Sequence, residues 1–143
     1  MEPILNIDNL KVSFMTSNGE VQAVRGVSFS VGKGEILGIV GESGSGKSVT
    51  SMSILHLLAD TARIKEGSSI RFDGEELIGA ARKRMREIRG EKISMIFQDP
   101  MSSLNPLIPV GKQVAEMLLE HHKDISGEEA KKAVLELFAK VRI

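Results

Sequence analysis

The chain has 143 residues, enough for one domain with a hydrophobic core, and its 41% of hydrophobic residues is typical of globular proteins. Lysine plus arginine and aspartate plus glutamate both number 19, so no net charge favours nucleic acid or anionic lipid as a partner. The absence of cysteine excludes disulfides, thiolate metal sites and a cysteine nucleophile, and fits a cytoplasmic location. No stretch has the apolar length of a membrane span, so we expect membrane attachment only through a partner.

The first part of the chain predicts an antiparallel β layer. Apolar and polar residues alternate over residues 10–14 and again over residues 27–31, and Asn18-Gly19 lies between the two runs as a turn signal. Residues 36–40, Ile-Leu-Gly-Ile-Val, form a continuous apolar run of the kind found in strands buried on both faces. This run is the first indication of a parallel sheet.

The elements that follow alternate between helix and strand. We expect helices over residues 47–58, 80–88, 110–120 and 128–141, and strands over residues 67–72 and 93–97. Ser126 with Glu129 three residues later predicts a capping box at the start of the last helix. The order of elements predicts an α/β fold with an antiparallel layer at the front and helices at the end.

A complete phosphate-binding motif lies between the apolar run and the first helix. Residues 41–48, GESGSGKS, match G-x-x-x-x-G-K-[ST] in full. Glycines let backbone N–H groups approach a polyphosphate closely, and the helix that follows directs its positive dipole end at the same anion. Lys47 is expected to contact the β and γ phosphates and Ser48 to ligate Mg²⁺. The alternative is a glycine-rich turn that binds nothing, but the full pattern in this setting is rare by chance.

The residues expected to bind the nucleotide therefore cluster in one short segment. They are Gly41, Ser43, Gly44, Ser45, Gly46, Lys47, Ser48, Val49 and Thr50.

A second segment narrows the class of phosphate-binding protein. Residues 95–106 read MIFQDPMSSLNP. Phe-Gln at the end of a predicted strand resembles the Q-loop of ABC ATPases, and the continuation is similar to the importer subunits of the oligopeptide, dipeptide and nickel group. Residues 10–14, 19–24 and 26–29 also resemble the opening strands of that group. The resemblance covers essentially the whole chain.

The resemblance implies a fold, cofactors and site residues. It implies a P-loop core with an N-terminal antiparallel β subdomain over residues 1–100 and the start of a helical subdomain over residues 101–143. ATP and Mg²⁺ are the implied cofactors. Gln98 is the implied γ-phosphate sensor, with a catalytic role beside Lys47 and an approach to the metal, because its amide can accept from water. Phe14 matches the aromatic that stacks on adenine, although a core phenylalanine is the open alternative.

The resemblance also implies partners and an incomplete site. The implied partners are transmembrane permease subunits, a second ATPase subunit, either identical or different, and indirectly a substrate-binding protein, at the cytoplasmic face of the membrane. The chain carries no Leu-Ser-Gly-Gly-Gln signature, no Walker B strand and no switch histidine. We therefore expect negligible ATPase activity from the chain alone. The part of the family's domain that carries these motifs should also contribute central strands, so we expect an incomplete parallel sheet and self-association through its exposed edges. The cargo is not encoded in an ATPase subunit.

Other interpretations of the sequence carry less weight. A small-molecule kinase would use the basic run at residues 82–92 as a lid, which leaves the Gln98 segment unexplained. A truncated product with weak nucleotide affinity is the non-enzymatic alternative. The basic run has no interleaved aromatics, so a solvated helix face is favoured over a nucleic-acid surface. His121-His122 is not expected to bind a metal, since adjacent helical residues point about 100° apart.

Overall fold

The computed structural model describes residues 2–99, 103–122 and 124–142. The chain forms two compact units, Met1–Met85 and Arg86–Ile143, each described here by itself. The division into subdomains at residue 100 stays a prediction.

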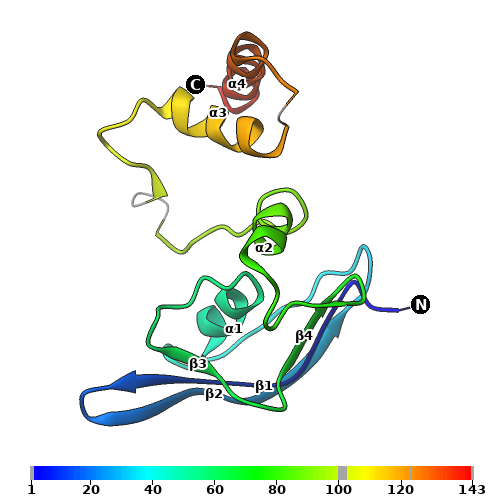
Figure 1. Ribbon diagram of the computed structural model, residues 1–143, viewed down its shortest axis with the longest axis vertical. Helices are drawn as coiled ribbons and strands as arrows, with labels where there is room; N and C mark the ends of the chain where they lie inside the picture. The colour runs from blue at the N-terminus through cyan, green and yellow to red at the C-terminus, as the bar shows by residue number, and fades with distance from the viewer. Residues whose placement is uncertain (1, 100–102, 123, 143) are drawn as a thin grey trace. The chain divides into compact units, whose positions relative to one another are not determined.

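The first unit is built on the predicted antiparallel layer. Figure 1 shows β1 and β2 as one long hairpin, and the turn between them is Ser17-Asn18, one residue earlier than the predicted Asn18-Gly19. Gly19 is the first residue of β2 and lies opposite Thr16. The strands are β1 (Leu5–Thr16), β2 (Gly19–Val31), β3 (Ala62–Ile64), β4 (Ser69–Phe72) and β5 (Glu75–Glu76). Their order is β2-β1-β4-β5, with β3 also paired to β1, and every pair is antiparallel. The two shortest strands, β3 and β5, have too few residues to show alternation and were not predicted.

The core of this unit lies on one face of the sheet. Its fully buried side chains include Ile7, Leu10, Val12 and Ile70. Leu10 and Val12 are two positions apart, as one face of a pleated sheet requires, whereas Ile7 and Leu10 are three apart because the pairing with β2 shifts register between them. Helix α1 (Lys47–Ile54) packs against β2.

Helix α1 is shorter than predicted and ends at Ile54. His56 adopts a left-handed conformation with φ 52°, which a continuing helix cannot contain. The N–H of His56 donates to the carbonyl of Ser53 at 3.2 Å, and the N–H of Leu57 donates to the carbonyl of Met52 at 2.9 Å. This pair of bonds is a Schellman motif, which satisfies the last carbonyls of the helix and stops it.

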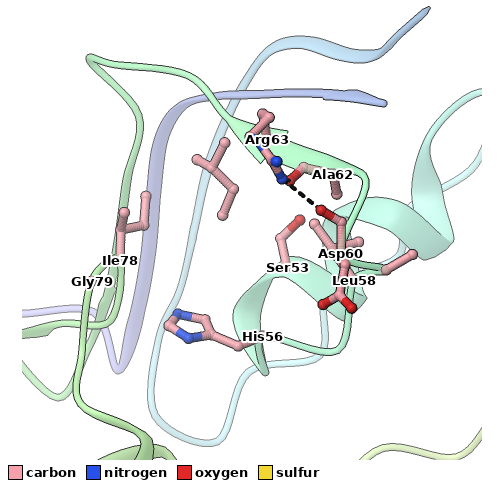
Figure 2. A pocket seen from close by; sticks show the side chains of 10 residues that line it. Ser53, His56, Leu58, Asp60, Ala62, Arg63, Ile78 and Gly79 are labelled. Atoms are coloured by element: carbon pink, nitrogen blue, oxygen red, sulfur yellow. Dashed lines mark hydrogen bonds between the residues drawn. The ribbon is translucent and has the colours of Figure 1, made fainter. Parts of the chain in front are cut away.

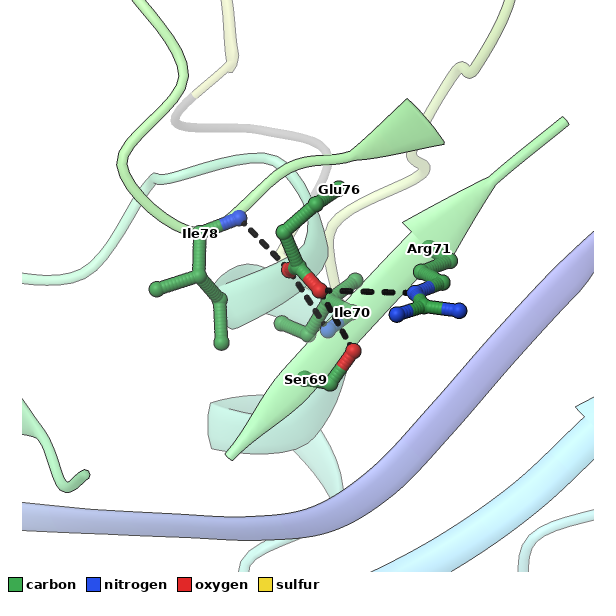
Figure 3. A network of polar contacts seen from close by, with 5 residues as sticks. All are labelled: Ser69, Ile70, Arg71, Glu76 and Ile78. Carbon is green, nitrogen blue, oxygen red and sulfur yellow. Dashed lines mark hydrogen bonds and ion pairs between the residues drawn. The ribbon is translucent and has the colours of Figure 1, made fainter. Parts of the chain in front are cut away.

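A carboxylate fastens β4 to the segment that follows it. Figure 3 shows the Glu76 side chain among its partners. Its Oε1 accepts from the N–H of Ile70 at 2.9 Å and of Ile78 at 3.0 Å, and its Oε2 accepts from the hydroxyl of Ser69. The guanidinium Nε of Arg71 lies 3.8 Å from Oε2. One side chain therefore holds the short β4–β5 hairpin closed.

The strands predicted over residues 36–40 and 93–97 do not form. Among the described residues no strand pairs with either segment; the nearest feature is an isolated bridge between Arg89 and Ile93. Ile36 is 96% exposed, Val40 94% and Ile96 94%. A strand buried on both faces needs hydrogen-bonded neighbours and apolar cover, and neither is provided by the described part of the chain. The prediction of these two strands was wrong for this structure.

The second unit is helical. Helix α2 (Arg82–Ile88) runs across the boundary between the units, and α3 (Val110–His121) packs on α4 (Gly127–Val141). The predicted capping box is confirmed: the Ser126 hydroxyl accepts from the N–H of Glu129 at 3.2 Å, and the Glu129 carboxylate accepts from the N–H of Ser126 at 2.8 Å. Within the described ranges, none of the helices combines the length and apolarity that crossing a membrane needs.

Candidate functional site

The predicted phosphate loop is a tight turn that leads directly into α1. Its glycines Gly44 and Gly46 have φ 79° and 91°, values that other residues rarely adopt. The N–H of Ser45 donates to the carbonyl of Glu42 at 3.2 Å, which closes the turn. A Cβ at Gly41 would lie 2.6 Å from the Ser45 hydroxyl, so a side chain at the first position of the loop would force Ser45 into another rotamer.

The ammonium group of Lys47 is held by the loop that precedes it. Its Nζ donates to the carbonyls of Gly41 at 2.6 Å and Glu42 at 2.7 Å, and to the hydroxyl of Ser45 at 3.2 Å. The side chain therefore folds back over the turn instead of extending into solvent. This arrangement fixes a positive charge at the mouth of the loop, where an anion could meet it.

The amino end of α1 adds further positive character. Gly46 is the N-cap residue, no side chain caps the helix, and its first turn has no acidic residue. The N–H groups of the first turn are therefore available to an anion, with the helix dipole behind them. Ser48 is exposed, whereas Thr50 is 4% exposed and donates its N–H to the Gly46 carbonyl at 2.8 Å. Thr50 thus contributes a backbone hydrogen bond to the first turn of α1, and its side chain is buried.

The residues present fit a magnesium-bound phosphate. Ser48 offers an exposed hydroxyl oxygen directly after Lys47, the position that the motif assigns to the metal. In the described part of the chain no three His, Cys, Asp or Glu side chains gather as a metal site. His121 pairs instead with Glu91, with 3.8 Å between Nδ1 and Oε2.

The adenine contact predicted at Phe14 lies in the same unit as the loop. Phe14 is half-buried in β1, between Val21 of β2 and Ala62 of β3. A half-buried ring is compatible with stacking on a base and with a core position. The assignment of Phe14 stays a prediction.

Gln98 belongs to the second unit and is exposed. Residues 100–102 of its characteristic segment lie outside the described residues. The segment resumes at Ser103 and is fastened to α3 by Gln113, whose amide exchanges bonds of 2.8 and 2.9 Å with the backbone of Asn105. The same amide donates to the Ile108 carbonyl at 2.7 Å. The sequence did not predict the role of Gln113 in holding this segment. The only signal for it was a polar residue on a predicted amphipathic helix.

A separate hollow of about 300 Å³ lies at the other end of α1. Figure 2 shows that His56, Asp60, Arg63 and Ile78 line it, while Ser53 reaches it from the helix. Nη1 of Arg63 donates hydrogen bonds there to the backbone carbonyls of Asp60 at 2.6 Å and Ala62 at 2.7 Å. None of the predicted site residues lines this hollow, so it is distinct from the phosphate loop.

Two arginines of the basic run pair with acidic side chains. Arg84 pairs with Glu75, with 2.7 Å between Nη2 and Oε2, and Arg86 lies 3.5 Å from Glu120. Arg84 and Arg86 thus each have an acidic neighbour within their own unit, as expected for a solvated helix surface.

Comparison with known proteins gives one consistent result. A family model described as ABC transporter matches residues 24–143. The oligopeptide transport ATP-binding protein OppD of Bacillus subtilis (strain 168) is 51% identical over 140 residues, which are 98% of this chain and 39% of the relative. The dipeptide transport ATP-binding protein DppD of Lactococcus lactis subsp. cremoris (strain MG1363) is 49% identical over 142 residues, 99% of this chain and 40% of the relative.

A solved structure agrees with these relatives. The dimeric structure of MJ0796, a bacterial ABC transporter cassette, matches with a TM-score of 0.81 and 25% identity, over 97% of this chain and 57% of that chain. The chain thus spans about two fifths of the length of the curated relatives that it matches.

Proposed function

The chain belongs to the ABC transporter family, and from this premise we propose that it is the nucleotide-binding part of a subunit that powers import of oligopeptides or dipeptides. The observation that carries the proposal is the complete phosphate loop, with the Lys47 ammonium held over its carbonyls at the start of α1. Membership in this family leaves the small-molecule kinase without support.

The predicted site residues other than Val49 and Thr50 each have a role in this proposal. The backbone of residues 41–46 and the first N–H groups of α1 bind the phosphates, and Lys47 supplies the charge that contacts the β and γ phosphates. Ser48 ligates Mg²⁺, which when bound neutralises part of the phosphate charge. Phe14 stacks on adenine, and Gln98 senses the γ phosphate and the membrane partner.

The intact protein hydrolyses ATP to ADP and phosphate and couples this reaction to transport. Two ATPase subunits close head to tail around two nucleotides, and permease subunits hold them at the cytoplasmic face of the membrane. A substrate-binding protein and the permease select the cargo. Support comes from the relatives, which are named as peptide transport ATP-binding proteins, and from the cassette, which is described as dimeric.

Calorimetric titration with Mg-ATP tests nucleotide binding. We expect the chain to bind with a Kd of roughly micromolar order and Lys47→Ala to lose most of this affinity, because the loop then lacks its fixed cation. Lys33→Ala, which removes an exposed lysine of the same unit outside the loop, should bind as the parent chain does. Failure of the parent chain to bind would favour the interpretation of a non-functional truncated product.

Uptake measurements test the cargo. Cells that lack the gene for the intact protein should lose uptake of labelled dipeptides and oligopeptides. Expression of the parent protein should restore uptake, and expression of the Lys47→Ala protein should not. Unchanged peptide uptake in the deleted strain, combined with loss of nickel uptake, would reject peptides as the cargo.

A further inference from the structure

We propose that Val24, beside a β-bulge in β2, positions the phosphate loop and thereby sets its affinity for nucleotide. The inference rests on the proposed function, since it concerns the same loop. It assigns a role to a strand residue that lies outside the phosphate-binding motif.

The first observation is an irregularity in the long hairpin. Val12 of β1 lies opposite Val24 of β2, but the next residue, Ser13, lies opposite Gln22. Ala23 is therefore an extra residue without a partner in β1, which is the pattern of a β-bulge. A bulge bends its strand and redirects the groups beside it, so this stretch of β2 departs from the regular pleat.

The second observation is that the phosphate loop rests on this bulge. A Cβ built on Gly46 would lie 2.6 Å from the carbonyl oxygen of Ala23 and 3.2 Å from Cγ2 of Val24. Gly46 also has φ 91°. Both the backbone conformation and the space therefore require glycine at the point where the loop meets β2. Val24 is only 4% exposed, so its side chain forms a fixed part of this surface.

Gly46 connects this contact to the groups that bind phosphate. Its carbonyl accepts from the N–H of Thr50 at 2.8 Å, which begins α1. The next residue is Lys47, whose ammonium spans the loop to the carbonyls of Gly41 and Glu42. A shift of Gly46 would displace the first N–H groups of the helix and the Lys47 side chain together. Val24 is accordingly a positioning residue, which acts through Gly46 rather than on the ligand.

A pair of opposed valines gives a matched experiment. Val24→Ala and Val12→Ala each remove the same atoms from facing positions of one hairpin, and Val12 is fully buried. We expect similar losses of stability in urea denaturation. The Kd for Mg-ATP, measured by calorimetry on the full 143-residue chain, should rise about tenfold in Val24→Ala, because small misplacements of binding groups are costly, and stay within about twofold in Val12→Ala. Val24→Ile, which keeps both branches, should retain the parent affinity.

The outcomes separate the inference from the proposed function. Equal Kd values for the parent chain, Val24→Ala and Val12→Ala would overturn the inference alone, and so would equal losses of affinity in the two alanine variants. No binding by the parent chain would overturn the proposed function and the inference with it. If Val24→Ala does not fold, the smaller change Val24→Cys is compared with Val12→Cys by the same criteria.

Discussion

At the scale of single residues, the phosphate loop shows that two glycines with similar backbone angles have different neighbours. Gly44 and Gly46 have φ 79° and 91°. A side chain at Gly44 would point into open space, whereas one at Gly46 would collide with the Ala23 carbonyl oxygen. The sequence predicts that both glycines bind phosphate, although the motif itself fixes only Gly46, and the structure adds a packing constraint at that position.

This difference predicts unequal costs of substitution. We expect Gly44→Ala to lower the free energy of unfolding by about 1–2 kcal/mol, through the left-handed backbone alone. Gly46→Ala should lower it by roughly 3 kcal/mol or more, because the clash with backbone adds to that strain. Urea denaturation measures both. Equal losses in the two variants would show that the contact with β2 is not rigid.

A second residue-scale prediction concerns Glu76 and pH. Burial raises the pKa of this carboxyl, but hydrogen bonds from Ser69, Ile70 and Ile78 and the charge of Arg71 outweigh it, so the pKa lies below its usual value. A pKa lowered in the folded state adds stability that is present above the unfolded value of about 4.3 and is lost as pH falls through the folded value.

The test is the pH dependence of stability in Glu76→Gln. Because the carboxylate is partly exposed and screened, we expect the variant to lose only about 0.5–1 kcal/mol at neutral pH. Its stability should also fall less steeply between pH of about 5 and 3 than that of the parent chain. Glu66→Gln, an exposed carboxylate of the same unit, is the control and should keep the parent slope. A parent-like slope in Glu76→Gln would contradict the assignment.

At the scale of elements, the helices differ in how they begin. Helix α4 begins with a reciprocal capping box between Ser126 and Glu129. Helix α1 begins at Gly46 with no side-chain cap. The capping box of α4 satisfies its first N–H groups internally, whereas α1, like α3 at Pro109, has no side-chain cap. The uncapped end of α1 differs from that of α3 because it directly follows the glycine-rich loop, where an anion can bind.

Ser126→Ala should therefore destabilise α4. We expect a loss of about 1 kcal/mol, because the N–H of Glu129 loses its acceptor. Glu128→Ala removes an adjacent acidic residue of the same turn without touching the box, and should cost less. Far-UV circular dichroism during urea denaturation measures both variants. A larger effect in Glu128→Ala would mean that charge at the helix end matters more than the cap.

At the scale of the whole molecule, apolar segments outside the two cores are the main feature. Ile36 and Val40 are among the most exposed apolar residues. Their pattern is that of a strand buried on both faces, so their exposure leaves apolar surface and unpaired backbone.

This exposure predicts self-association of the chain. Sedimentation velocity should show oligomers that increase with concentration, and the double variant Ile36→Asp/Val40→Asp should shift the distribution toward monomer, because charge opposes burial of this segment. Leu135→Asp, on a 58% exposed position of α4, is the control and should leave the distribution unchanged. A strictly monomeric parent chain would contradict the prediction.

Catalysis is also a property of the whole molecule. The chain has the phosphate loop but no signature motif and no Walker B carboxylate to position the attacking water. We expect steady-state phosphate release by the 143-residue chain to be negligible, even where Mg-ATP binds. Normal turnover that is abolished by Lys47→Ala would refute this expectation.

The sequence by itself determined the elements whose information is local. The β1–β2 hairpin, the position of its turn to within one residue, the helices and the Ser126 capping box follow from short-range periodicity and capping, because these depend on residues a few positions apart. The family could also be predicted from sequence motifs, because residues 41–48 and the segment around Gln98 are each continuous in the chain.

Tertiary structure decided those features that depend on contacts between residues far apart in the sequence. Whether residues 36–40 and 93–97 are strands depends on hydrogen-bonding partners elsewhere, which an apolar pattern cannot supply. The end of α1 at a Schellman motif and the hydrogen bonds of Glu76 depend on backbone geometry. The residue types at these positions allow that geometry but do not specify it. The contact of Gly46 with the bulge at Ala23 joins residues far apart in sequence, and only the folded hairpin brings them together.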